Sequence, residues 1–175
     1  MSDEQVDILD ENHSVLYSTL KTTAHQLGLL HKTVIGEVIN KKGEWLLVKQ
    51  SSSRQDPGQY VSPIGGHVRA AESCEEALKR EAMEELGISV ETFEYIGNFV
   101  FNRSVIGRKE NHLFVVYEVH CDQQILLNEE SVGFVWMSPT ELRDIFHQNP
   151  SFFGASFHAV VDNLFPHLKT NALSE

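Results

Sequence analysis

The sequence contains little cysteine and no long apolar run. Its two cysteines, Cys74 and Cys121, are too few for a disulfide framework and lack the paired spacing of a zinc site. No apolar stretch approaches the roughly 20 residues that span a bilayer, and the acidic N-terminal segment lacks the apolar core of a secretory signal. We therefore expect a cytoplasmic protein that does not contact membranes.

Basic side chains are scarce as well. Lys and Arg number 14 against 25 Asp and Glu in 175 residues, so the net charge is −11. A field of this sign repels nucleic acid, and no nucleic-acid partner is expected. A small phosphorylated substrate would need a divalent cation or a local basic patch at its binding site. The length predicts a single domain over residues 1–175.

Hydrophobic periodicity predicts strands and helices in a mixed order. Strands are expected at 31–39, 44–50, 92–102, 112–120 and 131–137. Helices are expected at 73–86, 139–148 and 154–165. The polar segments 51–60 and 105–111 predict loops. Because no regular βαβ repeat is visible, the fold class is α/β with a mixed sheet.

Residues 1–30 are predicted to form an N-terminal extension. It contains a short hairpin over 7–12 and 15–19 and a brief helix that ends at Gly28. Thr22 or Thr23 is the expected cap of that helix. The extension is also a candidate contact in a homodimer.

The segment 65–88, GGHVRAAESCEEALKREAMEELGI, carries the strongest functional signal. Ser73 and Glu76 predict a capping box, and Gly87 suits the left-handed position that follows a helix. At about 100° per residue, one apolar face of this helix packs on the sheet. Three glutamates lie beside that face: Glu81, Glu84 and Glu85.

Carboxylates at this helical spacing repel one another. A solvated acidic face is the simplest interpretation of such a cluster, but its neighbours favour a bound cation. Gly65 and Gly66 allow the backbone to approach a ligand closely, and Arg80 can pair with Glu72. A Mg²⁺ ion offsets the repulsion between crowded carboxylates, because it binds oxygen ligands from the protein together with those of substrate phosphates.

This segment resembles the Nudix box. The matching residues are Gly66, Glu72, Arg80, Glu81, Glu84, Glu85 and Gly87, and the soft departure is Ala82, where the family prefers a bulkier apolar residue. The resemblance implies an α/β/α sandwich, with a mixed β-sheet between helices, that hydrolyses a diphosphate linkage with Mg²⁺ or Mn²⁺. It implies metal ligands at Glu81, Glu84, Glu85 and the carbonyl of Gly65. In the same motif Arg80 supports catalysis, and Gly66, Glu72 and Gly87 are structural.

Hydrolysis also needs a general base. The base is either a glutamate of the box or Glu110, in the segment 105–111. Glu129 and Glu130 are weaker alternatives. A solvated loop charge remains the simple interpretation of Glu110.

Several residues are candidates for holding the substrate. Arg108 and Lys109 can meet phosphate, and His67 can contact substrate or metal. Phe101 is a candidate for stacking on a nucleobase. The alternative is that it packs in the core, as strand aromatics with a period of two usually do.

A second likeness covers DILDEN (7–12), AHQLGLLHKT (24–33) and PGQYVSPIGGHV (57–68), which resemble the isopentenyl-diphosphate isomerase branch of the Nudix superfamily. Isomerases of that branch use a cysteine where this chain has Gly65, and a second glutamate where it has His112. They also bind a metal through histidines. His25 and His31 are nevertheless expected to pack or to hydrogen-bond.

We therefore expect a hydrolase of a small nucleoside-diphosphate-type substrate rather than an isomerase. An isomerase-type enzyme is one alternative. A non-catalytic domain that senses a nucleotide is another, although such a domain would be expected to lose box glutamates, and here all are present.

Overall fold

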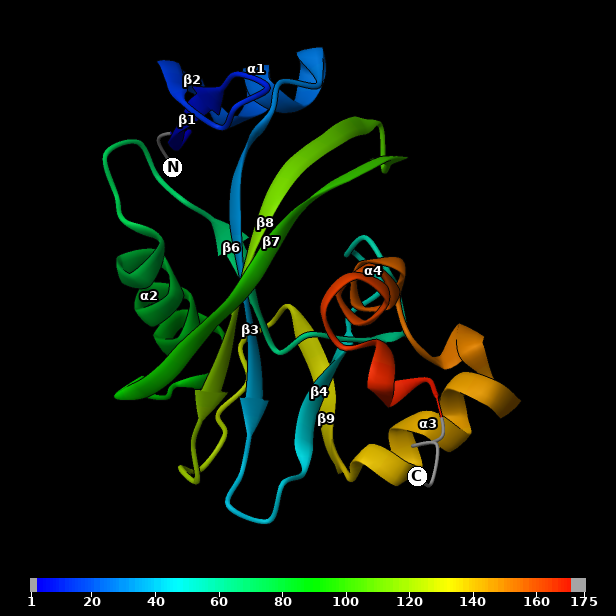
Figure 1. Cartoon of the computed structure of the whole chain (residues 1–175). Coiled ribbons are helices and arrows are strands. Elements are labelled where there is room, and N and C mark those ends of the chain that lie inside the picture. Colours follow the sequence, from blue (N-terminus) through cyan, green and yellow to red (C-terminus); the bar gives the residue numbers. More distant parts are fainter. Residues whose placement is uncertain (1–2, 171–175) are drawn as a thin grey trace.

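A mixed sheet of nine strands runs through the structure (Figure 1). The computed structural model describes residues 3–170. The strands are β1 (Gln5–Leu9), β2 (Val15–Leu20), β3 (His31–Ile39), β4 (Trp45–Gln50), β5 (Tyr60–Val61), β6 (Ile64–His67), β7 (Thr92–Val105), β8 (Arg108–His120) and β9 (Ser131–Met137). The helices are α1 (Lys21–Leu27), α2 (Cys74–Leu86), α3 (Pro139–Gln148) and α4 (Ala155–Leu164), with short 3-10 helices η1 (Pro150–Phe152) and η2 (Pro166–Leu168). In this described part, no helix is long and apolar enough to cross a membrane.

Strand β3 is the centre of the sheet. It pairs in parallel with β8, from His31 opposite His112 to Ile39 opposite His120, and antiparallel with β6. The other pairings among the described strands are antiparallel. The N-terminal segment adds β1 and β2 to the same sheet, and the long β7–β8 hairpin reaches up toward α1 (Figure 1).

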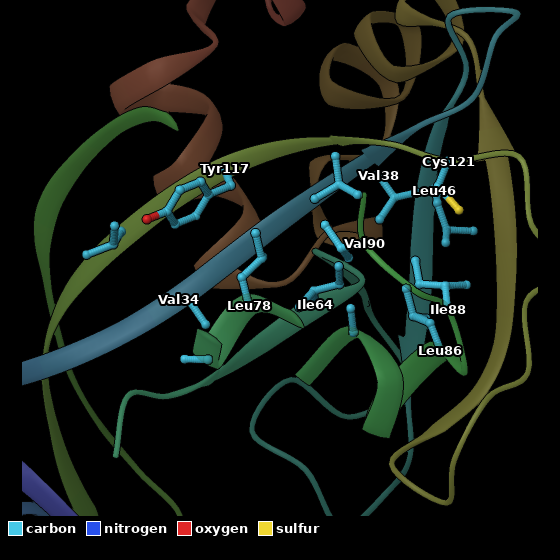
Figure 2. Packing of buried hydrophobic residues seen from close by; sticks show 14 of the residues in the cluster. Val34, Val38, Leu46, Ile64, Leu78, Leu86, Ile88, Val90, Tyr117 and Cys121 are labelled. Carbon is cyan, nitrogen blue, oxygen red and sulfur yellow. The ribbon is translucent and has the colours of Figure 1, made fainter. Parts of the chain in front are cut away.

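Helices cover both faces of the sheet because its strands carry apolar side chains on both sides. Along β3, Val34 and Val38 pack with α2, whereas Ile35 and Ile39 pack with α3 and α4. Figure 2 shows the first of these clusters, in which Leu78 of α2 meets the sheet. The expected α/β architecture with a mixed sheet between helices is confirmed.

The capping signals locate α2 and α3 correctly. Ser73 accepts a hydrogen bond from the backbone N–H of Glu76, and Ser138 does the same for Glu141. In both boxes the glutamate side chain accepts the N–H of the serine in return. Helix α2 ends at Gly87, whose φ of 65° is the left-handed value expected there.

The loop predicted at 105–111 is wrong, because β7 and β8 continue through most of it. Only Ile106 and Gly107 form the turn, with φ values of 43° and 73° that suit a two-residue hairpin connection. Pairing therefore continues past Arg103 opposite Glu110 and ends with Val105 opposite Arg108. The sequence did not predict this strand, because its alternate side chains are charged and face a polar cavity instead of an apolar core.

Two smaller features also differ from the expectation. No strand was predicted at residues 64–67, yet they form β6 and pair with β3. Helix α1 follows Leu20 without a side-chain cap, instead of beginning at Thr22 or Thr23. Its end at Gly28 is as expected.

Candidate active site and metal centres

Three adjacent strands bring histidines to one face of the sheet. His31 of β3 lies directly opposite His112 of β8. His67 of β6 lies opposite Thr33, which is the next residue of β3 that points the same way as His31. Because residues paired across strands project to the same side, these three imidazoles converge. Helix α1 contributes a fourth, that of His25, whose ring centroid lies 5.0 Å from that of His67.

The four imidazoles form a compact histidine centre, made up of His25, His31, His67 and His112. One ring nitrogen of each lies within 4.8 Å of those of the others. His25 Nε2 is 3.2 Å from His112 Nε2 and 3.1 Å from His67 Nε2. An imidazole nitrogen carries either one proton or one lone pair in the ring plane, so His25 Nε2 cannot bond well to both. A cation that accepts several lone pairs removes this conflict.

His31 is oriented in the way that a metal ligand requires. Its Nδ1–H donates a hydrogen bond to the carbonyl of Leu29 at 2.7 Å, which leaves the lone pair on Nε2. That Nε2 is buried and has no hydrogen-bond partner among the described residues. An unpaired nitrogen in a buried cluster costs free energy unless it is coordinated.

Burial also keeps the imidazoles neutral. Burial lowers the pKa of His25 to about 4 and that of His112 to about 2, with further lowering from the charge of Arg108 and from the repulsion that would arise if two neighbouring imidazoles were protonated together. The pKa values of His31 and His67 are lowered mainly by burial as well. Neutral imidazole is the form that binds metal, and such nitrogen donors suit Zn²⁺, Cu²⁺, Ni²⁺ or Fe²⁺ better than Mg²⁺.

The side chains of the α2 glutamates extend to β6, the strand that carries His67. Gly66 permits this approach, because a Cβ atom at that position would lie 2.0 Å from Glu81 Cδ. Gly65 donates its backbone N–H to Glu85 Oε2 at 2.9 Å. Glycine at position 66 therefore lets the Glu81 carboxylate lie directly against the strand, and the backbone N–H of Gly65 holds that of Glu85 there.

Arg80 ties the loop before α2 to the helix, as the sequence predicted. Its Nε and Nη2 donate to the two oxygens of Glu72 at 2.8 and 2.9 Å, and its Nη1 donates to Glu81 at 2.5 Å. Nη2 also donates to the carbonyl of His67 at 2.9 Å. The hydrogen bonds to Glu72 raise the pKa of Arg80, which stays charged. One guanidinium thus connects the carboxylate group to the strand that carries His67.

The carboxylates are held where ionisation is costly. Burial raises the pKa of Glu81 and, more strongly, that of Glu85, although Arg80 and the Gly65 N–H oppose the shifts. Glu84 is the exposed member and lies 3.7 Å from Arg80. A set of crowded oxygen donors of this kind fits a hard divalent cation such as Mg²⁺ or Mn²⁺.

The carboxylates of Glu81, Glu84 and Glu85 line a cavity of 1170 Å³, and so do His67 and His112 of the histidine centre. Of the residues singled out from the sequence, its wall contains Gly65, Gly66, His67, Glu81, Glu84, Glu85, Arg108, Glu110 and Glu130. Arg80 and Glu72 support this wall, while Gly87 ends α2. The structure therefore brings the box and the histidine centre to a single site.

Glu110 occupies a buried position on β8. Arg103 Nε donates to one of its oxygens at 2.6 Å, and Arg108 Nη2 donates to the other at 2.9 Å. Arg103 Nη1 also donates to the buried Asp56 at 2.8 Å. Burial alone would raise the pKa of Glu110, but hydrogen bonds and charge from Arg103 and Arg108 outweigh it and lower that pKa. The carboxylate therefore orients two guanidinium groups at the cavity wall.

Other candidate residues lie away from the cavity. Lys109 is on the opposite side of β8 from Arg108, and its aliphatic stem lies beside Gly28. Phe101 stacks on Phe114, with ring centroids 4.9 Å apart, and packs with the cluster under α3 and α4. Glu129 is exposed.

Sequence reasoning missed two residues of this site entirely, and it assigned His25 and His31 to packing or hydrogen bonding instead of to the histidine centre. His112 and Arg103 were not predicted as site residues, because the segment between them was taken as a loop. The available signal was the alternation of Arg108, Glu110 and His112, which places three polar side chains on one face of a strand.

The chain resembles known proteins along most of its length. It is 24% identical over 168 residues to "Isopentenyl-diphosphate Delta-isomerase 2" from Photorhabdus laumondii, with 93% of each chain covered. It is 25% identical over 146 residues to "Nudix hydrolase" from Deinococcus radiodurans, with 81% of this chain and 83% of the relative covered. The crystal structure of DR0079 from Deinococcus radiodurans superposes with a TM-score of 0.71 at 22% identity, over 91% of this chain and 98% of that one.

The family model described as "NUDIX domain" matches residues 29–154. This range contains the carboxylate box and three of the four clustered histidines. The matched range, the fold and the spacing of the box agree, and the chain belongs to the NUDIX domain family.

Proposed function

We propose that this protein hydrolyses a diphosphate linkage in a small nucleoside-diphosphate-type substrate. The observation that carries the proposal is the wall formed by Glu81, Glu84 and Glu85, whose carboxylates line one cavity, with the pKa values of Glu81 and Glu85 raised by burial. These carboxylates, with the carbonyl of Gly65, would hold Mg²⁺ or Mn²⁺. The ion would supply positive charge that neutralises the diphosphate oxygens and stabilises the leaving phosphate.

The side chains of this wall have separate roles in the proposal. Arg80, bonded to Glu72 and Glu81, holds the carboxylates in register with β6. A box glutamate accepts the proton of the attacking water. Glu110 is less suited to that role, because two arginines engage its oxygens and lower its pKa. We assign Glu110 to positioning Arg103 and Arg108, with Arg108 and His67 facing the substrate.

The histidine centre is proposed to hold a second ion of a different kind. Its four neutral imidazoles and the unpaired Nε2 of His31 support a transition metal such as Zn²⁺. This site would lie beside the carboxylate wall, since His67 directly follows Gly66 in β6.

An isomerase-type reaction is the competing enzyme function, and the likeness to isopentenyl-diphosphate isomerases favours it. The cysteine implied for such an enzyme is Gly65 here, and the second glutamate is His112. Moving a proton onto and off an unactivated alkene needs an acid and a base on opposite faces of the substrate. Glycine supplies no proton-transfer group, so hydrolysis is the better supported reaction.

A phosphate-release assay tests the proposal. Nucleoside diphosphates, ADP-ribose and dimethylallyl diphosphate would be incubated with Mg²⁺ or Mn²⁺, and isomerisation of isopentenyl diphosphate would be followed in parallel. Glu85→Gln should reduce hydrolysis at least about 100-fold. Glu75→Gln, an exposed glutamate of the same helix, should not. Isomerisation without hydrolysis would overturn the proposal, as would nucleotide binding by the wild-type protein without turnover of any substrate.

A further inference from the structure

Strand β2 forms one edge of the sheet. Among the described strands it pairs with β1 alone, so its other side faces outward at the end of the sheet that lies far from α3 (Figure 1). Proteins protect such edges with charged side chains, with proline or with a covering segment, because unpaired N–H and C=O groups accept another strand. The sequence of β2, VLYSTL, contains no charge and no proline. This edge therefore lacks two of the usual protections.

Exposed apolar side chains concentrate on this edge and on the helix that follows it. They belong to Val15, Leu16, Tyr17, Leu20 and Leu27, which are between 42% and 64% exposed. The other exposed large apolar side chains of the described residues are spread over α2, β7, β9 and the connecting turns. Because alternate residues of a strand project to opposite faces, Tyr17 and Leu20 make both faces of β2 apolar. A contiguous exposed group of this kind marks an interaction surface.

The hydrogen bonds of the β1–β2 hairpin show which backbone groups of β2 point outward. Lys21 donates its N–H to the carbonyl of Glu4 at 2.7 Å, so these two residues form a hydrogen-bonded pair. Bonded and non-bonded pairs alternate along an antiparallel ladder, and the register is regular from Leu20 to Tyr17. The N–H and C=O groups of Ser18 and Leu20 therefore point away from β1, toward the open edge.

From this edge we infer that the protein forms a symmetric dimer in which β2 pairs antiparallel with β2 of a second copy. A two-fold axis at Ser18 makes the strand complementary to itself, because the two Ser18 residues then exchange N–H to C=O hydrogen bonds. Tyr17 lies opposite Thr19 of the second copy. At each end of the ladder, Leu20 lies beside Leu16 of the second copy, and such apolar pairs stabilise neighbouring strands.

Charge favours a second copy at this edge and also sets how the dimer responds to salt. Each chain carries a net charge of −11, so two copies repel one another over most of their surfaces. The uncharged β2 is a place where they can meet without bringing like charges together. Salt screens the remaining repulsion between the two chains, so the dimer should become stronger as the salt concentration rises.

The contact is short, and the dimer is accordingly weak. It uses one strand of six residues and ends where α1 begins at Lys21. The register shift of the hairpin adds Leu16 as an extra residue beyond Tyr17, so the regular part of the ladder is its centre. Obligate dimers bury about 2,000 Å² or more, which this edge does not reach. We therefore expect a dissociation constant on the order of 10 µM.

Sedimentation equilibrium of the full chain from about 1 to 200 µM tests the inference. The wild type should change from monomer to dimer over this range, with more dimer in about 0.5 M salt than in about 0.05 M. Ser18→Pro should stay monomeric, because proline removes the outward N–H at the axis and breaks no backbone hydrogen bond to β1. Ser18→Ala is the matched control. It removes the same hydroxyl, which donates to Asp7, but keeps the N–H, so it should dimerise like the wild type.

Two further variants keep the test decisive if proline disturbs the hairpin, which a melting curve would reveal. Leu20→Lys places an ammonium group in the apolar contact and should weaken the dimer at least about tenfold. Leu126→Lys, at an exposed leucine between β8 and β9, should not. Ser18→Cys should form a disulfide-linked dimer on oxidation, since the Cα atoms of a hydrogen-bonded antiparallel pair lie about 5.5 Å apart. The wild type, with its own two free cysteines, is the control for this cross-link.

Two results would overturn the inference. One is a wild-type protein that stays monomeric at the highest concentration in both salt conditions, which would leave the edge to a strand of another protein. The other is dimerisation of both Ser18→Pro and Leu20→Lys with wild-type strength, because the contact would then lie elsewhere on the surface.

Discussion

Gly66 lies so close to Glu81 that a methyl group at this position would come within 2.0 Å of the Glu81 Cδ atom. The contact involves the carboxyl group itself, which also accepts a hydrogen bond from Arg80. The neighbouring Gly65 differs, because a Cβ there would meet only Ile35 Cδ1 at the ordinary distance of 3.5 Å. Two adjacent glycines of one strand therefore carry different constraints.

This difference predicts opposite results for two alanine substitutions. Gly66→Ala should displace the Glu81 carboxylate and reduce hydrolysis at least about 100-fold, because a ligand moved by an ångström no longer meets its cation. Gly65→Ala should fold normally and retain activity within about tenfold. The comparison uses kcat/KM with Mg²⁺ and a melting curve for each variant. Equal loss in both variants would mean that the Gly66–Glu81 contact is not the determining constraint.

The histidine centre should bind a transition metal stoichiometrically. After dialysis against Zn²⁺ and removal of free ion, elemental analysis should find one zinc per chain. His112→Gln should lower the zinc affinity at least about tenfold, since it removes one of the imidazole donors. His147→Gln, an exposed histidine of α3, serves as the control. Unchanged zinc content in His112→Gln would exclude His112 as a ligand.

The buried Glu37 should make stability depend on pH. Burial, partly opposed by the hydrogen bond from Ser62, raises the pKa of Glu37 to about 8. The folded protein therefore holds a proton that the unfolded chain releases near pH 4.5, and stability falls as the pH rises through this window. The slope from this one group is on the order of 1 kcal/mol per pH unit.

Glu37→Gln isolates this contribution, because other titrating groups are shared by the two proteins. Urea unfolding at pH 6, 7 and 8 should show the variant gaining stability relative to wild type at each step. A difference that is constant over this range would mean that Glu37 is already ionised in the folded protein.

The two arginines on Glu110 should differ in their contribution to stability. Arg103 pairs with both Asp56 and Glu110, whose side chains are 7% and 4% exposed. Arg103→Met would leave Asp56 buried without its cation and should lower the free energy of unfolding by about 3–5 kcal/mol. Arg108→Met should cost less, because Arg103 still neutralises Glu110. Denaturant unfolding of both variants decides the order, and a larger loss for Arg108→Met would contradict this account.

Much of the carboxylate wall could be predicted from sequence because its determinants are local. The capping box at Ser73, the helical spacing of Glu81 to Glu85 and the glycine at 87 lie within one short segment. Helix geometry alone then places the glutamates beside the buried face. The pairing of Arg80 with Glu72 followed from the same segment.

The histidine centre could not be predicted in this way. Its members are separated by up to 87 residues, and His25 and His31 each look like an ordinary packed residue when considered alone. The register of β6, β3 and β8 brings them together, and register depends on long-range pairing. The segment around Glu110, which was expected to be a loop, is a strand because β7 and β8 pair along it, and the Glu110 carboxylate is buried between two arginines.

The sequence by itself therefore determined the helix, its caps and the row of carboxylates, because neighbours along the chain specify them. Only the tertiary structure decided that four distant imidazoles face one another, that Gly66 and not Gly65 is sterically constrained, and that carboxylates of α2 and imidazoles of β6 and β8 line one cavity. Those features arise from contacts between elements that are far apart in the chain, and no local pattern encodes them.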